Sequence, residues 1–96
     1  MKNSQLIRQL KVYKEQSSER YGIKRLGVFG SCAVGGETEK SDIDIVVELD
    51  TPDIFKLVHI KEELEGLLGK PVDIVRSRPR MNPYLRKHIE SRAIYV

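Results

Sequence analysis

Two aspartates that are separated by one residue, Asp42 and Asp44, stand at the start of an apolar stretch that ends at Leu49. On a β-strand successive side chains point to opposite faces, so these two carboxylates share one face while Ile43 and Ile45 point to the other. Like charges on one face repel each other, and their burial is costly unless a cation pairs with them. Mg²⁺ removes this problem because it prefers oxygen ligands and is held by carboxylates together with substrate phosphates. The alternative is a solvated acidic pair beside a turn, with no metal.

Three further features favour a site for a metal-bound nucleoside triphosphate. Gly30 and Ser31 follow the largely apolar run 23–29, and a glycine at such a turn lets backbone N–H groups approach an anion closely. A third aspartate, Asp73, interrupts the apolar segment Pro-Val-Asp-Ile-Val. Burial of its charge there costs free energy unless the carboxylate binds a partner such as a cation. The segment 37–53 is rich in acids although the chain carries a net charge of +3. A phosphate-binding turn and three carboxylates together predict such a site.

The spacing of these residues carries a family resemblance. Gly30-Ser31, followed after ten residues by Asp42-Ile43-Asp44, resembles the signature of the DNA polymerase beta-type nucleotidyltransferase superfamily. The chain length and the downstream Asp73 resemble its minimal branch, the minimal nucleotidyltransferase (MNT) proteins, which are often encoded beside a helical HEPN protein as toxin–antitoxin pairs. The resemblance extends from about residue 23 to residue 96. The chain departs from the family at Val34, where an arginine is common.

The resemblance implies an enzyme that moves a nucleoside monophosphate, AMP from ATP, to a hydroxyl of a HEPN-type partner protein, with Mg²⁺ as cofactor. It implies that Asp42, Asp44 and Asp73 are the catalytic and metal-binding residues, and that Gly30 and Ser31 bind the nucleotide. Asp73 either completes a second metal site or accepts the proton of the attacking hydroxyl. The alternative is a non-catalytic antitoxin that neutralises its partner by complex formation. The sequence leaves open whether the chain forms a homo- or a hetero-oligomer.

Length and composition are typical of a small globular protein. The 96 residues, 40% hydrophobic and 32% charged, predict one domain over 1–96 with one modest core. No apolar run approaches the roughly 20 residues that span a membrane, and the first residues contain no apolar segment of signal-peptide type. The one cysteine, Cys32, excludes an internal disulfide and fits a reducing cytoplasm. The two histidines, His59 and His88, fit no zinc spacing, so we expect them to be surface or packing residues.

Positive charge gathers at both ends of the chain. A basic stretch near the C-terminus could meet nucleic acid, a triphosphate or an acidic protein surface. A small nucleic-acid-binding protein is therefore a third interpretation, but the acidic centre and the lack of interleaved stacking aromatics disfavour it. The charges between residues 76 and 92 are Arg76, Arg78, Arg80, Arg86, Lys87, Arg92 and the single acid Glu90.

The sequence predicts alternating helices and strands. We expect helices over 4–20, from Thr51-Pro52-Asp53 to Gly69, and from Asn82-Pro83 for about two turns. Strands are expected over 23–29, 42–49 and 71–76, with an edge strand at 93–96 and a helical turn at 32–34. This order predicts an α/β (α+β) fold, a small mixed sheet with helices packed mainly on one face. The residues expected to form the apolar stripe of the middle helix are Ile54, Leu57, Val58, Leu64, Leu67 and Leu68.

The loop between the first two strands is short enough for an antiparallel pair. That pairing brings Ser31, at the end of one strand, near Asp42 and Asp44 at the start of the next. The predicted site also requires Asp73 to lie on a neighbouring strand and to face the same side of the sheet.

Overall fold

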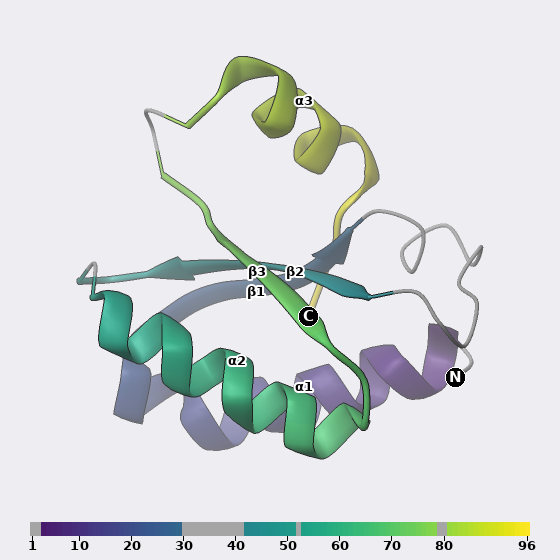
Figure 1. Ribbon diagram of the computed structural model, residues 1–96, viewed down its shortest axis with the longest axis vertical. Helices are drawn as coiled ribbons and strands as arrows, with labels where there is room; N and C mark the ends of the chain where they lie inside the picture. Colours follow the sequence, from purple (N-terminus) through teal and green to yellow (C-terminus); the bar gives the residue numbers. More distant parts are fainter. Residues whose placement is uncertain (1–2, 30–41, 52, 79–80) are drawn as a thin grey trace.

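The computed structural model of the chain describes residues 3–29, 42–51, 53–78 and 81–96. These residues confirm the predicted type and order of the elements (Figure 1). The helical turn predicted at 32–34 lies outside the described residues. The described elements are α1 (Asn3–Tyr21), β1 (Ile23–Phe29), β2 (Ile43–Leu49), α2 (Ile54–Leu68), β3 (Val72–Arg76), α3 (Pro83–Arg92) and β4 (Ile94–Tyr95).

The described strands form one mixed sheet in the order β3-β2-β1-β4. β1 pairs antiparallel with β2, as predicted, and its other edge pairs antiparallel with β4. β2 and β3 are parallel because α2 carries the chain back from the end of one to the start of the other. The mixed sheet expected from the sequence is therefore confirmed.

The main hydrophobic core lies between one face of the sheet and the two helices α1 and α2 (Figure 1). The predicted inward positions of β2, Ile43, Ile45 and Val47, are fully buried. Truncation of one buried Leu or Ile in such a core to Ala costs about 2–5 kcal/mol. The helical residues that cover this face and are fully buried are Leu6 and Leu10 in α1 and Ile60 and Leu64 in α2.

The third helix covers the opposite face of the sheet. Figure 1 shows α3 on the other side of the strands from α1 and α2. A smaller cluster holds it there, in which Met81 and Ile89 pack with Phe29 of β1 and Val46 of β2. Helices thus lie mainly on one face, as predicted, and α3 occupies part of the other.

The start of α2 differs from the prediction by two residues. Asp53, rather than Thr51, is the N-cap: its backbone is extended, and its carboxylate accepts a hydrogen bond of 2.9 Å from the N–H of Phe55. A carboxylate caps as well as a hydroxyl and also complements the positive end of the helix dipole. Pro52 lies outside the described residues. The predicted end is confirmed, because Gly69 takes a left-handed φ of 70° that favours glycine.

The predicted apolar stripe of α2 is wrong at several positions. The buried side chains are Ile60, Leu64 and Leu68, of which Ile60 was not predicted. Ile54 is 70% exposed and Val58 is 44% exposed. The spacing of four residues between the buried positions defines a narrow inner face, and the other apolar residues of α2 lie outside it.

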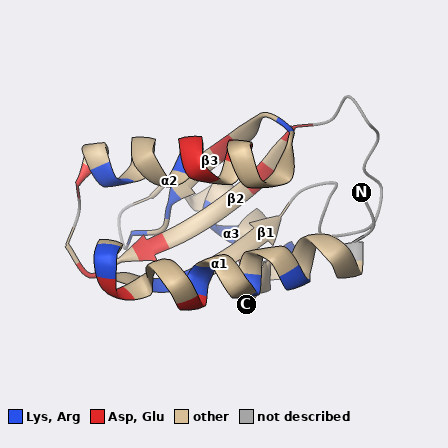
Figure 2. Cartoon of the chain, turned by 90° about the horizontal axis from the view of Figure 1, so that it is seen from below, with Lys and Arg blue, Asp and Glu red and all other residues tan. Residues whose placement is uncertain are grey.

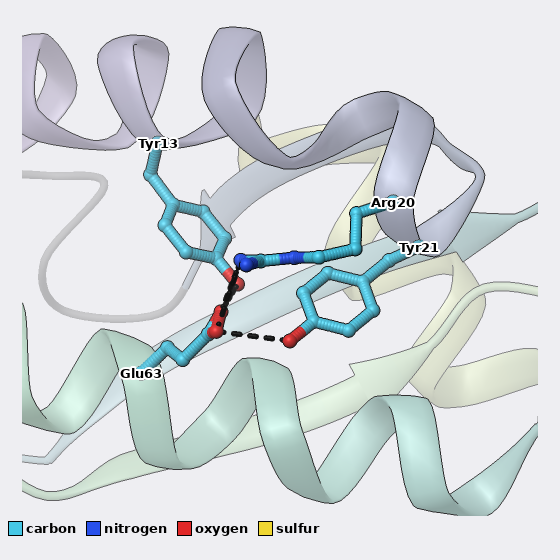
Figure 3. A network of polar contacts seen from close by, with 4 residues as sticks. All are labelled: Tyr13, Arg20, Tyr21 and Glu63. Carbon is cyan, nitrogen blue, oxygen red and sulfur yellow. Dashed lines mark hydrogen bonds and ion pairs between the residues drawn. The ribbon is translucent and has the colours of Figure 1, made fainter.

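A polar network joins α1 to α2. The carboxylate of Glu63 accepts hydrogen bonds from the hydroxyls of Tyr13, at 3.1 Å, and Tyr21, at 2.9 Å (Figure 3). The Arg20 guanidinium pairs with the same carboxylate at 2.9 Å and lies over the Tyr21 ring. Burial, followed by the Glu63 charge, raises the pKa of Tyr13 far above its usual range. The network therefore stabilises the protonated phenol and fixes the contact between the two helices.

The outer surfaces of α1 and α2 carry charged residues together with exposed apolar side chains, such as Phe55 of α2, which is 74% exposed. Figure 2 shows basic and acidic residues interspersed along both helices. In the part of the chain that the structure describes, no helix combines the length and the apolar character needed to cross a membrane.

Candidate functional site

The structure places Asp44 and Asp73 directly opposite each other on neighbouring strands. Asp44 is the second residue of β2 and pairs with Asp73, the second residue of β3. Because β2 and β3 are parallel, paired residues point to the same side of the sheet. That side is the one covered by α3, since Val46 and Val75, two positions further along each strand, belong to the cluster under α3. Asp73 therefore faces the same side of the sheet as Asp44, which the predicted site requires.

The third carboxylate, Asp42, stands immediately before β2 and is exposed. Partial burial of Asp44 raises the pKa of its carboxyl, and the charges of Asp73 and then Asp42 raise it further. The three predicted acidic residues therefore interact electrostatically. Their mutual repulsion favours either proton uptake at Asp44 or a nearby cation.

A fourth residue of this site was not predicted from the sequence. His88 projects from α3, and its ring meets the ring of Phe29 edge-on with centroids 6.2 Å apart. Its charge lowers the pKa of Asp44, opposite in sign to the effect of the other two aspartates. The only signal for it in the sequence is its place next to Ile89, which packs on the sheet. Only the position of α3 reveals that a histidine stands near the carboxylates.

Gly30 and Ser31, the predicted nucleotide-binding residues, lie outside the described residues. The described strand β1 ends at Phe29, which pairs with Asp44 of β2. The chain therefore leaves β1 beside the carboxylates.

The donor atoms of the site suit a hard divalent ion. Asp44 and Asp73 offer carboxylate oxygens from one face, and Mg²⁺ is usually held by one or two carboxylates plus substrate phosphates. Over the ranges that the structure describes, no three His, Cys, Asp or Glu side chains form a group that could hold a metal ion by themselves. The described carboxylates thus fit a metal that a bound substrate helps to hold.

Comparison with known sequences gives the family. The model of the nucleotidyltransferase domain matches residues 10–96 of the chain. A Methanocaldococcus jannaschii protein that is provisionally named protein adenylyltransferase MJ0128 is 44% identical over 88 residues, which cover 91% of this chain and 90% of that protein.

Solved structures agree with this match. One that is provisionally described as a minimal nucleotidyltransferase superposes with a TM-score of 0.82 at 35% identity and covers 98% of this chain and 95% of its own. Another, described as a toxin–antitoxin with AMP-PNP, superposes with a TM-score of 0.73 at 25% identity and covers 91% of this chain and 70% of its own. By fold, family model and relatives, the chain belongs to the nucleotidyltransferase domain family and, within it, to the minimal nucleotidyltransferases.

Proposed function

We propose that this nucleotidyltransferase moves AMP from ATP, with Mg²⁺ as cofactor, to a hydroxyl of a HEPN-type partner protein in the cytoplasm, as the antitoxin of the pair. The observation that carries the proposal is the opposition of Asp44 and Asp73 on one sheet face, with Asp42 close enough to raise the pKa of Asp44. A non-catalytic fold gains nothing from repulsion between three carboxylates.

Each predicted site residue has a role in this reaction. Asp42, Asp44 and Asp73 would hold Mg²⁺, which neutralises negative charge on the phosphates when it is bound. Gly30 and Ser31 would hold the phosphates through backbone N–H groups and the serine hydroxyl. The bond between the acceptor oxygen and the α-phosphorus forms, the bond from the α-phosphorus to the bridging oxygen breaks, and pyrophosphate leaves. Asp73, if it is not occupied as a metal ligand, takes the proton of the attacking hydroxyl on its carboxylate.

The names of similar proteins support the acceptor and the donor in this proposal. The Methanocaldococcus jannaschii relative is provisionally named a protein adenylyltransferase, which agrees with a protein acceptor and an AMP group. The similar toxin–antitoxin structure is described with AMP-PNP, an ATP analogue. The HEPN character of the partner follows from the family resemblance.

A second candidate function is a non-catalytic antitoxin that binds and neutralises its partner. The observation that favours it is that a similar solved structure is described as a toxin–antitoxin, an assembly that such a binding function would also form. The two candidates differ in one measurable respect, the covalent transfer of a nucleotide.

The test is incubation of the chain with α-labelled ATP, Mg²⁺ and the HEPN-type protein encoded beside it. We expect the label to become covalently attached to the partner, and Asp44→Asn to reduce the transfer at least about 100-fold, the scale of losing one electrostatic element of an active site. Glu62→Gln, an exposed change on α2, is the matched control and should leave transfer unchanged. A stable complex without any transfer of label would establish the non-catalytic antitoxin instead.

A further inference from the structure

One row of side chains crosses the sheet at the level of the aspartates. Phe29, the last residue of β1, pairs with Asp44 of β2, and Asp44 pairs with Asp73 of β3. Paired residues of neighbouring strands point to the same side of the sheet, with Cβ atoms roughly 5 Å apart in an antiparallel pair. Phe29 belongs to the cluster under α3, so the whole row faces that helix. The aspartates therefore have an aromatic neighbour at one end of the row.

His88 of α3 packs on this aromatic neighbour. Its ring meets the ring of Phe29 at an interplanar angle of 80° with centroids 6.2 Å apart, which is an edge-to-face contact. The contact holds the imidazole over the residue that pairs with Asp44. The influence of His88 on the pKa of the Asp44 carboxyl agrees with this placement. The histidine is exposed, so its side chain is accessible to a ligand bound at the aspartates.

The orientation of α3 also directs His88 toward the aspartates. Arg86 and Glu90, two residues before it and two after it, line a pocket of about 490 Å³ together with Glu48, near the far end of β2. Successive residues of a helix are about 100° apart, so side chains two positions away lie roughly 160° around the helix. His88 therefore lies on the flank of α3 opposite that pocket, which is the flank toward Asp44.

An imidazole at this place suits a phosphate oxygen better than a magnesium ion. Mg²⁺ prefers oxygen ligands at about 2.0–2.1 Å, whereas imidazole nitrogen suits zinc and other transition metals. A phosphate oxygen on a metal held by Asp44 would lie roughly 3–4 Å from the carboxylate oxygen, because both are ligands of one small ion. The imidazole carries at least one N–H in either protonation state. It can therefore donate a hydrogen bond to a phosphate beside Asp44.

We propose that His88 is a nucleotide-binding residue whose imidazole donates a hydrogen bond to the triphosphate. The proposal rests on the proposed function, because it places the phosphates of ATP between the aspartates and α3. Two parts of the fold then bind the phosphates, the carboxylates of the sheet through the metal and α3 through the histidine. The helix thus contributes a ligand-binding group as well as a packing face.

The test compares His88→Phe, which keeps an aromatic ring against Phe29 but has no N–H on it, with His88→Lys, which restores a donor and a positive charge. The Kd of AMP-PNP with Mg²⁺ is measured by calorimetry. We expect His88→Phe to raise this Kd about tenfold, the scale of one hydrogen bond to a charged group, and His88→Lys to stay within about threefold of the natural chain. His59→Phe, at an exposed position of α2, is the matched control and should leave the Kd unchanged. Thermal unfolding without nucleotide verifies that all three variants are folded.

Inorganic tripolyphosphate identifies the part of the nucleotide that the histidine contacts, because it contains the phosphate chain without the nucleoside. In the presence of Mg²⁺, we expect His88→Phe to weaken its binding by about the same factor as that of AMP-PNP. A loss confined to AMP-PNP would place the contact at the nucleoside and overturn the proposal. Equal Kd values in the natural chain and in His88→Phe would also overturn it, and so would a loss in His88→Lys as large as that in His88→Phe.

Transfer kinetics separate this proposal from the proposed function. With labelled ATP and the HEPN-type protein, His88→Phe should raise the KM for ATP and leave the KM for the partner unchanged. A raised KM for the partner alone would assign His88 to the acceptor, which overturns the proposal and leaves the proposed function intact. If the natural chain binds AMP-PNP but transfers no label, the proposed function fails, and the Kd measurements still decide the role of His88. Absence of AMP-PNP binding by the natural chain would overturn both.

Discussion

At the scale of single residues, the carboxyl of Asp44 receives opposing influences from its neighbours. Burial and the charges of Asp73 and Asp42 raise its pKa, and His88 lowers it. Asp73 lies on β3 and Asp42 stands immediately before β2, whereas His88 lies on α3. His88 is thus the side chain through which α3 acts on the carboxylate.

Replacement of this histidine should change the titration of the aspartate in a known direction. In His88→Gln, the lowering influence is lost, so the pKa of Asp44 should rise further above its ordinary value. The measurement is a pH titration of the carboxyl carbon resonance by NMR in the absence of divalent ions. His59→Gln, an exposed histidine on α2, is the control and should leave the resonance unchanged. An equal titration curve in all three proteins would show that His88 has no influence on the aspartate.

At the scale of elements, the path from β2 through α2 to β3 fixes the positions of the two opposed aspartates. The Glu65 carboxylate of α2 accepts a hydrogen bond of 3.0 Å from the N–H of Val72, the first residue of β3. Lys61 pairs with the same carboxylate at 3.2 Å. The hydrogen bond from the Val72 backbone, and then Lys61, lower the pKa of Glu65. This contact ties the end of α2 to the start of the strand that carries Asp73.

The lowered pKa predicts a pH dependence of stability. The folded state binds the proton of Glu65 more weakly than the unfolded chain does, so the stabilisation is present above the ordinary glutamate pKa of about 4.3 and is lost as the pH falls through the lowered folded value. Glu65→Gln should therefore lower the melting temperature at pH 7, and the difference from the natural chain should shrink toward pH 3. Glu62→Gln, which is exposed on the same helix, should follow the natural chain throughout. A constant difference across the pH range would contradict the assigned linkage.

At the scale of the whole molecule, one face of the sheet packs the main core and the other face carries the aspartates. The face packed by α1 and α2 carries the main core, and the face partly covered by α3 carries Asp44 and Asp73 at one end and a pocket of about 490 Å³ at the other. A ligand on the second face therefore binds without disturbing the main core. Such a ligand should stabilise the folded chain by mass action.

We therefore predict that nucleotide binding raises the melting temperature of the chain. AMP-PNP with Mg²⁺ at a hundred times its Kd should add about 2.7 kcal/mol to stability, which for a domain of this size raises the melting temperature by roughly 10–20 °C. Excess EDTA should remove the shift, because the carboxylates and the phosphates then repel each other. Asp73→Asn should weaken it and Glu62→Gln should keep it. A full shift in the presence of EDTA would show that the triphosphate binds without a metal.

The sequence alone predicted the fold class, the order of the elements and the antiparallel pairing of the first two strands. These features depend on the period of apolar residues and on turn residues such as Gly69, which act over a few positions of the chain. The shared face of Asp42 and Asp44 remains a prediction from strand periodicity, because the described strand β2 begins at Ile43. The metal, nucleotide and acceptor roles of the predicted residues remain predictions that the experiments above test.

The tertiary structure decided what depends on contacts between distant segments. It set Asp44, rather than Asp42, opposite Asp73, since strand register is fixed by the whole crossover through α2. It buried Ile60 and exposed Ile54, since the rotation of a helix against its sheet is chosen by the packing of the complete core. It also brought His88 of α3 to the aspartates and formed the pocket beyond them, because a helix so short and polar carries no local signal of the face on which it packs.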